Sequence, residues 1–340
     1  MKMVDVHDAS GMVLFHDVTQ IIPGKFKGPA FRKGHIIEAD DIPKLLKLGK
    51  QHIYVCEIHN GFLHEDEAAI RIARAAAGQG IILSEPKEGK VDLIAGQDGL
   101  LKIRIDTLNA VNSVEDIVLS TLHTNQKVSM GRSIAGTRII PLVIEARKIE
   151  HIESLCNQYH PLIEIMPLRA FTVGIVTTGS EVYRGLIKDQ FGPVVSQKLE
   201  ESGCRVIGQT LASDEVSLIV KAILTFIREG AQMITVTGGM SVDPDDVTPA
   251  AIKEAGASVV TYGAPVLPGA MFMLAYIGEV PVIGLPGCVM YHRTTIFDLI
   301  LPRLLAGERL SRQDIVQLGH GGLCSGCGTC NYPLCGFGKG

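Results

Sequence analysis

Apolar runs of strand length alternate with amphipathic segments between residues 171 and 307. Residues 171–176, 233–236 and 281–285 are apolar and rich in Val and Ile, and each run ends in a loop of small residues. Residues 216–227 instead repeat apolar side chains at helical spacing. Short buried strands that alternate with amphipathic helices predict an α/β domain with a doubly wound, mostly parallel sheet.

Two helix starts can be predicted in the same stretch. Ser213 is a suitable N-cap because its hydroxyl can accept a backbone N–H, and two acidic residues follow it. Thr248 precedes Pro249, and proline is favoured in the first turn of a helix. We therefore expect helices to begin at these two positions.

The hydrophobic pattern divides the rest of the chain into smaller parts. Residues 1–60 and 61–168 mix strand runs with short helices, which predicts a smaller α+β N-terminal region ahead of the α/β domain at 169–310. Within it, two apolar runs flank the Gly-Gln-Asp-Gly sequence at 96–99, a pattern that predicts a β-hairpin. A helix is expected to begin at Ser113, and residues 319–340 form a separate tail rich in Gly and Cys.

Small polar residues gather at the predicted strand ends. Glycine and serine let backbone N–H groups approach an anion closely. Asp243, Asp245 and Asp246 follow the second strand loop, and carboxylates are suitable ligands for Mg²⁺. The pattern favours a phosphorylated ligand held with a divalent ion. The alternative is that the glycines only shape tight turns and that the aspartates cap a helix.

Four motifs share this region, at residues 177–181 (Thr-Thr-Gly-Ser-Glu), 237–241 (Thr-Gly-Gly-Met-Ser), 246–249 (Asp-Val-Thr-Pro) and 285–287 (Leu-Pro-Gly). Their order and spacing resemble the molybdopterin-binding domain of molybdopterin adenylyltransferases, molybdopterin molybdotransferases and gephyrin. The resemblance extends over residues 171–307. It combines features of the adenylyltransferase branch with features of the molybdotransferase branch.

The resemblance implies a ligand pocket and a catalytic pair. Loop residues would bind molybdopterin or its adenylated form, and they are Thr178, Gly179, Ser180, Glu181, Asp189, Gly238, Gly239, Ser241, Pro268, Gly269, Pro286 and Gly287. Asp246 and Asp214 match acidic positions of the family, where they would act in catalysis, and Asp246 would also bind Mg²⁺. Cys288 departs from the molybdotransferase pattern, which usually has asparagine after Leu-Pro-Gly.

The resemblance also implies a place in molybdenum cofactor biosynthesis. As a transferase, the protein would take part in Mg-dependent molybdate insertion or adenylyl transfer, with ATP and molybdate as partners. Alternatively, it would bind molybdopterin or the finished cofactor without turnover, and its tail would sense metal or bind a partner. A third hypothesis, nucleotide processing as in nicotinamide-nucleotide amidases that share the domain, lacks a recognisable amidase domain. Related domains form trimers or dimers, so we expect a homo-oligomer.

Four of the eight cysteines lie in the tail, at Cys324, Cys327, Cys330 and Cys335. Thiolates at such short spacing can converge on one metal, and disulfides are rare in cytoplasmic proteins. The spacing predicts a metal site, with an iron–sulfur cluster expected and zinc as the alternative. The tail has few core residues, so we expect it to be disordered without metal. The other cysteines are scattered, a pattern typical of buried reduced thiols, at Cys56, Cys156, Cys204 and Cys288.

Composition excludes several classes of function. The chain of 340 residues has a net charge of −4 and no tryptophan, which argues against nucleic-acid binding. No apolar run reaches the roughly 18 residues of a membrane span, and the first residues lack the apolar core of a signal peptide. We therefore expect a cytoplasmic protein without membrane contact. The basic loop with Lys25, Lys27, Arg32 and Lys33 indicates either contact with an anionic ligand or a solvated surface.

Overall fold

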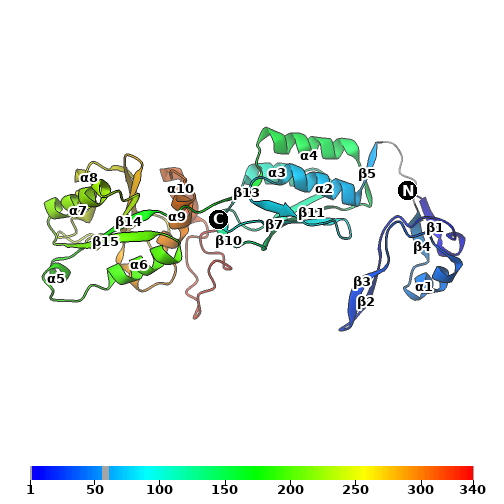
Figure 1. Ribbon diagram of the computed structural model, residues 1–340, viewed down its shortest axis with the longest axis horizontal. Helices are drawn as coiled ribbons and strands as arrows, with labels where there is room; N and C mark the ends of the chain where they lie inside the picture. Colours follow the sequence, from blue (N-terminus) through cyan, green and yellow to red (C-terminus); the bar gives the residue numbers. More distant parts are fainter. Residues whose placement is uncertain (1, 56–60, 340) are drawn as a thin grey trace. The chain divides into compact units, whose positions relative to one another are not determined.

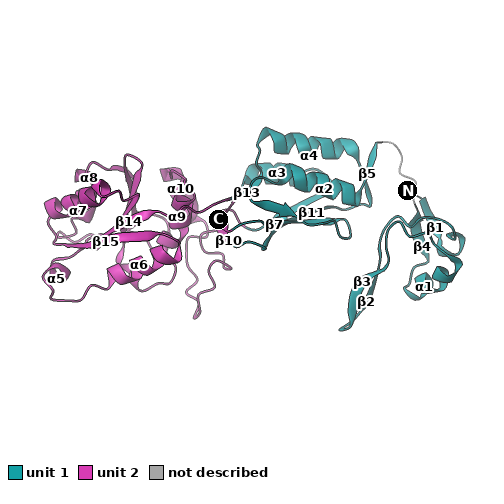
Figure 2. Ribbon diagram, in the orientation of Figure 1, with its two compact units in different colours: residues 1–97, 102–122, 129–165 teal, residues 98–101, 123–128, 166–340 magenta. Residues whose placement is uncertain are grey.

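The computed structural model describes residues 2–55 and 61–339. The chain forms two compact units (Figure 2). The first unit comprises residues 1–97, 102–122 and 129–165, and the second unit comprises residues 98–101, 123–128 and 166–340. The segment for which we predicted the α/β domain lies in the second unit.

A six-stranded sheet forms the centre of the second unit, in the order β15-β14-β16-β19-β18-β17. Strands β15, β14, β16 and β19 pair in parallel, and β18 and β17 extend the sheet as antiparallel strands. In that order, the bounds are Arg205–Ala212, Thr172–Thr178, Met233–Thr237, Val280–Leu285, Met273–Ile277 and Ser258–Tyr262. The predicted α/β fold with a mostly parallel sheet is confirmed.

Side chains alternate along these strands, so the sheet carries a separate apolar core on each face. Val173 of β14 packs into the core that contains α6 and α9, and Val176 packs into the core that contains α7 and α8. Figure 1 shows α7 and α8 on the face opposite α6. The four helices are α6 (Phe191–Glu201), α7 (Val216–Arg228), α8 (Thr248–Glu254) and α9 (Ile296–Leu305). Because both faces are covered, the strands appear in the sequence as continuous apolar runs.

Helix α8 begins at the predicted position, but α7 begins at Val216 and not at Ser213. Glu215 still has an extended backbone, with φ −109° and ψ 120°. The carboxylate of Asp214 accepts a hydrogen bond from the backbone of Ser180 at 2.8 Å. Residues 213–215 therefore do not form a first helical turn, because Asp214 is bonded to a neighbouring loop.

The second unit also contains short helical segments, and these are α5 (Ser180–Tyr183), η3 (Gly287–Met290), α10 (Arg312–Val316) and η4 (Gln317–Gly319). No helix within residues 2–55 and 61–339 is long and apolar enough to cross a membrane.

The first unit contains several small sheets, with orders β1-β4, β2-β3, β12-β5 and β6-β7-β11-β9, and a further sheet has the order β10-β8-β13. The strands are β1 (Lys2–Asp5), β2 (Val18–Ile22), β3 (Phe26–Phe31), β4 (His52–Val55), β5 (Phe62–His64), β6 (Ile81–Leu83), β7 (Lys90–Ala95), β8 (Gly99–Ile103), β9 (Ile117–Thr121), β10 (Gln126–Val128), β11 (Ser133–Ile139), β12 (Val143–Glu145) and β13 (Ile163–Met166). The helices are η1 (Val6–Asp8), η2 (Ala39–Asp41), α1 (Ile42–Lys47), α2 (Glu65–Ala76), α3 (Ile105–Asn112) and α4 (Ala146–Gln158).

Two local predictions for this region are wrong. Strand β7 pairs with β6 and β11, whereas β8 pairs with β10, so residues 96–99 connect two sheets and do not form a hairpin. Ser113 is the C-cap of α3 and does not begin a helix. The side chain of Asn112 donates to the carbonyl of Leu119 at 2.9 Å and accepts its N–H at 2.8 Å. This pair of bonds directs the chain into β9.

The close packing of α7 on the sheet gives a first prediction. A Cβ atom at Gly174 of β14 would lie 2.4 Å from the ring of Phe226. We expect Gly174→Ala to lower the free energy of unfolding by about 1–3 kcal/mol because overpacking strains a dense core. Urea denaturation measures this loss.

A double-mutant cycle tests the steric cause. If the ring is responsible, Gly174→Ala should cost much less in a Phe226→Leu background. Simple addition of the two single losses would contradict this explanation.

Candidate functional site

Three loops follow the carboxyl ends of neighbouring parallel strands. They are the first loop (residues 178–181), the second loop (residues 238–241) and the third loop (residues 286–287). Thr177 is in register with Thr237, and Thr237 is in register with Leu285. The loops therefore begin side by side at one edge of the sheet, which is where open α/β sheets bind their ligands.

Hydrogen bonds of Thr248 join the first two loops. Its hydroxyl donates to the carbonyl of Gly238 at 2.8 Å and lies 3.1 Å from the hydroxyl of Thr178. Since the one proton of Thr248 is used, Thr178 is the donor in the second bond. The N–H of Thr248 also donates to the carbonyl of Gly239 at 3.2 Å. Both threonine side chains are buried, so this contact fixes the two loops relative to each other.

The glycines of the second loop allow this close approach. Gly238 has φ +86°, and a Cβ atom there would lie 2.2 Å from the carbonyl oxygen of Thr178. Gly239 has φ +53°, and its Cβ would lie 2.9 Å from the hydroxyl of Thr248. Both positions require glycine for the fold itself, in addition to any role toward a ligand.

Asp214 contacts the first loop from the end of β15. Its carboxylate accepts the N–H of Ser180 at 2.8 Å, and its own N–H donates to the hydroxyl of Ser180 at 3.5 Å. Gly179 has φ +139° and leads into α5, on which Glu181 is exposed. The neighbouring Ser213 hydroxyl is buried, and within residues 2–55 and 61–339 it has no hydrogen-bond partner.

Asp246 lies in the turn that joins the second loop to α8. It is partly buried, and its carboxylate accepts the N–H of Asp243 at 3.1 Å. The hydroxyl of Tyr262 lies 2.9 Å from the carbonyl of Met240 and 3.1 Å from that of Ser241. Burial and the nearby Asp246 carboxylate raise the pKa of Tyr262. Asp214 and Asp246 thus lie at the same edge of the sheet on different loops.

The remaining predicted residues lie around this edge in supporting positions. Gly269 has φ +130°, and a Cβ there would lie 2.5 Å from the side chain of Ile296. The N–H of Ile296 donates to the carbonyl of Pro268 at 3.3 Å. These two residues therefore position the start of α9. Gly287 is exposed, and a Cβ atom there would have no neighbour within 4 Å.

The comparison with protein families agrees with this geometry. Residues 174–306 match the family model described as a probable molybdopterin binding domain. This part of the chain is a molybdopterin-binding domain. Residues 3–57 match a domain of unknown function (DUF8806).

Curated relatives match only through short segments. A molybdenum cofactor biosynthesis bifunctional protein of Synechococcus elongatus is 32% identical over 83 residues, which is 24% of this chain and 26% of that protein. A CinA-like protein of Mycobacterium sp. (strain MCS) is 33% identical over 79 residues, which is 23% of this chain and 19% of that protein. The match thus spans about a quarter of these relatives or less.

Solved structures that resemble part of this chain include two MoaB proteins. The molybdopterin biosynthesis enzyme MoaB from Thermus thermophilus is 24% identical, with a TM-score of 0.34, over 41% of this chain and 98% of that one. The tungsten cofactor synthesizing protein MoaB from Pyrococcus furiosus is 21% identical, with a TM-score of 0.30, over 35% of this chain and 84% of that one.

Asp189 of the molybdopterin-binding domain is part of a local network. Its carboxylate accepts the N–H of Phe191 at 2.9 Å and that of Gly192 at 3.1 Å, so it caps the start of α6. The amide of Gln209 donates to Asp189 at 2.6 Å and to Thr177 at 2.8 Å. Sequence reasoning missed Gln209 and Tyr262. Both lie on strands, where a polar residue in an alternating pattern gives no signal of a site.

The cysteine tail packs against the molybdopterin-binding domain. Phe337 is buried in the core beside α9, and Leu323 forms a bridge with Leu267. Among the described tail residues, Phe337 is the one buried apolar side chain of this core, and Cys324, Tyr332 and Cys335 pack against it while partly buried. Among the described residues, no group of three or more Cys, His, Asp or Glu side chains lies close enough to hold a metal ion.

The four tail cysteines nevertheless line one pocket of about 440 Å³. The hydroxyl of Thr294 lies 3.4 Å from the sulfur of Cys330. This hydrogen bond and one from the backbone of Tyr332 lower the pKa of Cys330. Of the tail cysteines, Cys327 is exposed and the other three are partly buried.

The scattered cysteines differ from those of the tail. Cys156 and Cys204 are buried, as predicted, and burial raises the pKa of Cys156 to about 11. Burial also raises the pKa of Cys204. Cys288 is only partly buried, and Cys56 lies outside the described residues. The two buried thiols are unreactive for this reason.

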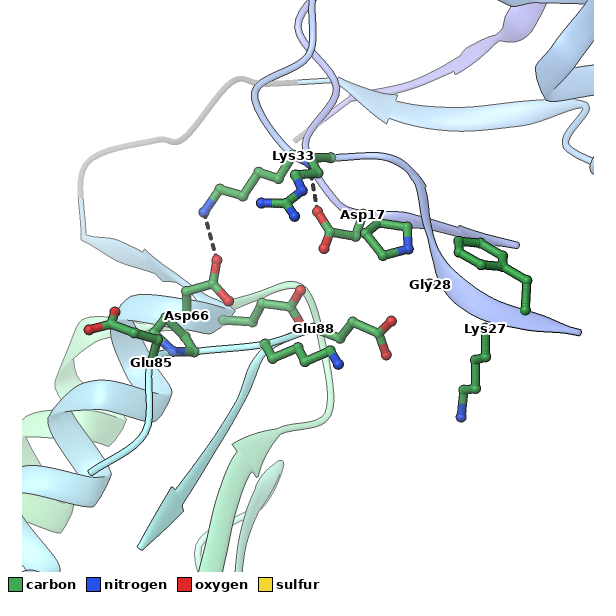
Figure 3. A pocket seen from close by; sticks show the side chains of 13 residues that line it. Asp17, Lys27, Gly28, Lys33, Asp66, Glu85 and Glu88 are labelled. Carbon is green, nitrogen blue, oxygen red and sulfur yellow. Dashed lines mark hydrogen bonds and ion pairs between the residues drawn. The ribbon is translucent and has the colours of Figure 1, made fainter. Parts of the chain in front are cut away.

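A second pocket, of about 860 Å³, lies in the first unit and includes part of the basic loop (Figure 3). Lys33 donates to Asp66 at 3.2 Å, and its ammonium group lies 2.7 Å from Nδ1 of His64. Asp17, Glu85 and further carboxylates line the same pocket. Lys33 therefore faces an acidic side chain, and the pocket is lined by both basic and acidic residues.

The joined loops yield a second prediction. Gly238→Ala should lower the free energy of unfolding by roughly 2–4 kcal/mol, because positive φ and overlap with Thr178 both strain the substituted residue. Gly287→Ala, at the same edge but in open space, is the matched control and should change stability by no more than about 0.5 kcal/mol. Thermal and urea unfolding of both variants measure the difference. Equal stability of the two variants would show that the loops are not packed as described.

Proposed function

We propose that the molybdopterin-binding domain binds molybdopterin, or its adenylated form, at the carboxyl edge of the sheet and takes part in a Mg²⁺-dependent transfer. The observation that carries this proposal is the joined pair of loops. Thr248 fixes the first loop to the second, and the same edge carries Asp214 and Asp246. The family match supports molybdopterin as the ligand.

The loops suit the phosphate of the ligand. Gly179, Gly239 and Gly287 have no side chain, so phosphate oxygens can approach the backbone N–H groups of this edge. The buried Ser213 hydroxyl has no partner among the described residues and provides one more hydrogen-bonding group at the end of β15. Each of these groups recognises an anion by direct hydrogen bonding, which is strongest where water is excluded.

The two acidic residues suit Mg²⁺ better than a metal that needs more ligands from the protein. Mg²⁺ is commonly held by one or two protein carboxylates together with the phosphates of the substrate. Asp246 and Asp214 would supply these two carboxylates, so a third acidic side chain is not needed. When bound, the ion would neutralise charge on the phosphate. The residues of the chain would orient the ligand and exclude water from it.

Two reactions fit this arrangement, molybdate insertion and adenylyl transfer from ATP. Purified protein is incubated with molybdopterin, ATP, Mg²⁺ and molybdate, and the products are resolved by mass. An adenylated pterin or a molybdenum-loaded pterin identifies the reaction. Binding of molybdopterin without product supports the alternative, a non-catalytic carrier whose tail serves a metal or a partner. The expected homo-oligomer, and its expected location in the cytoplasm, remain predictions.

The third loop provides a binding prediction. Gly287→Val adds a branched side chain to open, exposed space, so the fold tolerates it. We expect the affinity for molybdopterin to fall by roughly tenfold or more, which corresponds to about 1.4 kcal/mol. Gly336→Val is a matched control, since a Cβ at Gly336 also has no neighbour within 4 Å. Anaerobic titration followed by pterin fluorescence measures both. Unchanged affinity in Gly287→Val would place the ligand elsewhere.

The acidic turn provides a catalytic prediction. Asp246→Asn keeps the oxygen that accepts the N–H of Asp243, but it removes the charge. Transfer should slow by roughly a hundredfold or more, because stabilisation of charge in the transition state is lost. Glu254→Gln, an exposed change on α8, is the control and should keep full activity. Wild-type rates in Asp246→Asn would contradict the assignment.

A further inference from the structure

The tail of the second unit is built to a definite shape, although it is rich in glycine. The N–H of Cys324 donates to the carbonyl of Leu267 at 2.8 Å, and the N–H of Gly338 donates to the carbonyl of Gly321 at 2.9 Å. Gly338 lies against α9, where a Cβ would come within 2.4 Å of Leu299. Phe337 is buried, at 4% exposure. Both ends of the tail are thus fixed on the domain, and residues 325–335 form a loop between them.

The four cysteines of the tail line one pocket. All of them line the pocket of about 440 Å³, together with Arg293 and Thr294 from the segment before α9. Cys324 and Cys335 pack against the core of the domain, whereas Cys327 is exposed. One wall of the pocket is therefore rigid, and the other wall is a loop.

We propose that this pocket binds an iron–sulfur cluster through the thiolates of Cys324, Cys327, Cys330 and Cys335. The spacing of two residues between the first three cysteines is that of bacterial ferredoxin runs. The site is distinct from the proposed pterin site, because none of its thiolates belongs to the three loops at the sheet edge.

The geometry distinguishes a cluster from a single zinc ion. Tetrahedral zinc with Zn–S bonds of about 2.3 Å requires all four sulfurs within about 3.8 Å of each other. Among the described residues, no group of three or more Cys, His, Asp or Glu side chains is arranged to hold a single metal ion. A cluster of several iron and sulfide atoms fills a larger volume, so its thiolates can stay spread around the pocket wall. Gly326, with φ +64° and open space around it, allows the loop to adjust.

Other uses of the four thiols fit less well. A nucleophilic cysteine needs one activated thiol, whereas here four thiols line one pocket. The described cysteines, including these four, are free and form no disulfide. Residues 287–296 connect the third loop to Thr294 and Ile296. The segment that lines the cluster pocket therefore follows the pterin edge directly in the sequence.

The experiment uses the full chain, purified without oxygen and reconstituted with ferrous iron and sulfide. We expect about one cluster per chain, with iron and acid-labile sulfide in similar amounts and visible charge-transfer absorption. Cys327→Ser should lose most of the iron. Because Cys327 is exposed, this change should leave the far-UV circular dichroism of the protein unchanged.

Two controls keep the test specific. Ser325→Ala changes a neighbour of the cysteines, and Cys156→Ala removes a buried thiol of the first unit; both should keep the cluster. Zinc without sulfide at the same stoichiometry would overturn the cluster. Absence of bound metal, or iron content unchanged in Cys327→Ser, would also overturn it.

Discussion

The second unit depends on the close contact between the first two loops of its sheet. The hydroxyl of Thr248 reaches the carbonyl of Gly238 and the hydroxyl of Thr178 at once. This is possible only where the loop has no side chain, since a Cβ at Gly238 would lie 2.2 Å from the carbonyl oxygen of Thr178. Two strand ends, one helix start and both acidic loops are positioned by this one contact. Asp214 is bonded to Ser180 of the first loop, and Asp246 lies in the turn between the second loop and α8, so this contact links the segments that carry the two carboxylates.

A second group of contacts positions the start of α9 and the tail. The residues around Gly269 and Ile296 fix the start of α9, and the tail pairs with Leu267 next to them. The start of α9 therefore supports both the sheet edge and the cysteine pocket. Its capping box, in which Thr295 and Asp298 satisfy each other's backbone N–H groups, keeps that start rigid.

Much of the fold could be predicted because its signals are local. The strands β14, β16 and β19 are apolar runs, and the loops after β14 and β16 contain the glycines that positive φ requires. The candidate acidic residues could be named from the motif around Asp246. The contacts of Gln209 and Tyr262 could not, because each joins residues about 20 or more positions apart. The Gly-Gln-Asp-Gly segment led to a wrong prediction, since such a sequence permits a turn but does not choose the partner strand.

The segment between the third loop and α9 has a thermodynamic consequence. Residues 287–296 contact the tail through Thr294 and begin at the third loop, so one segment connects the proposed pterin edge to the cysteine pocket. Binding free energies linked through a shared element are reciprocal. If a metal centre in the tail changes the affinity for the pterin by some factor, the pterin must change the affinity for the metal by the same factor. The occupancy of each site would then depend on the concentrations of both ligands.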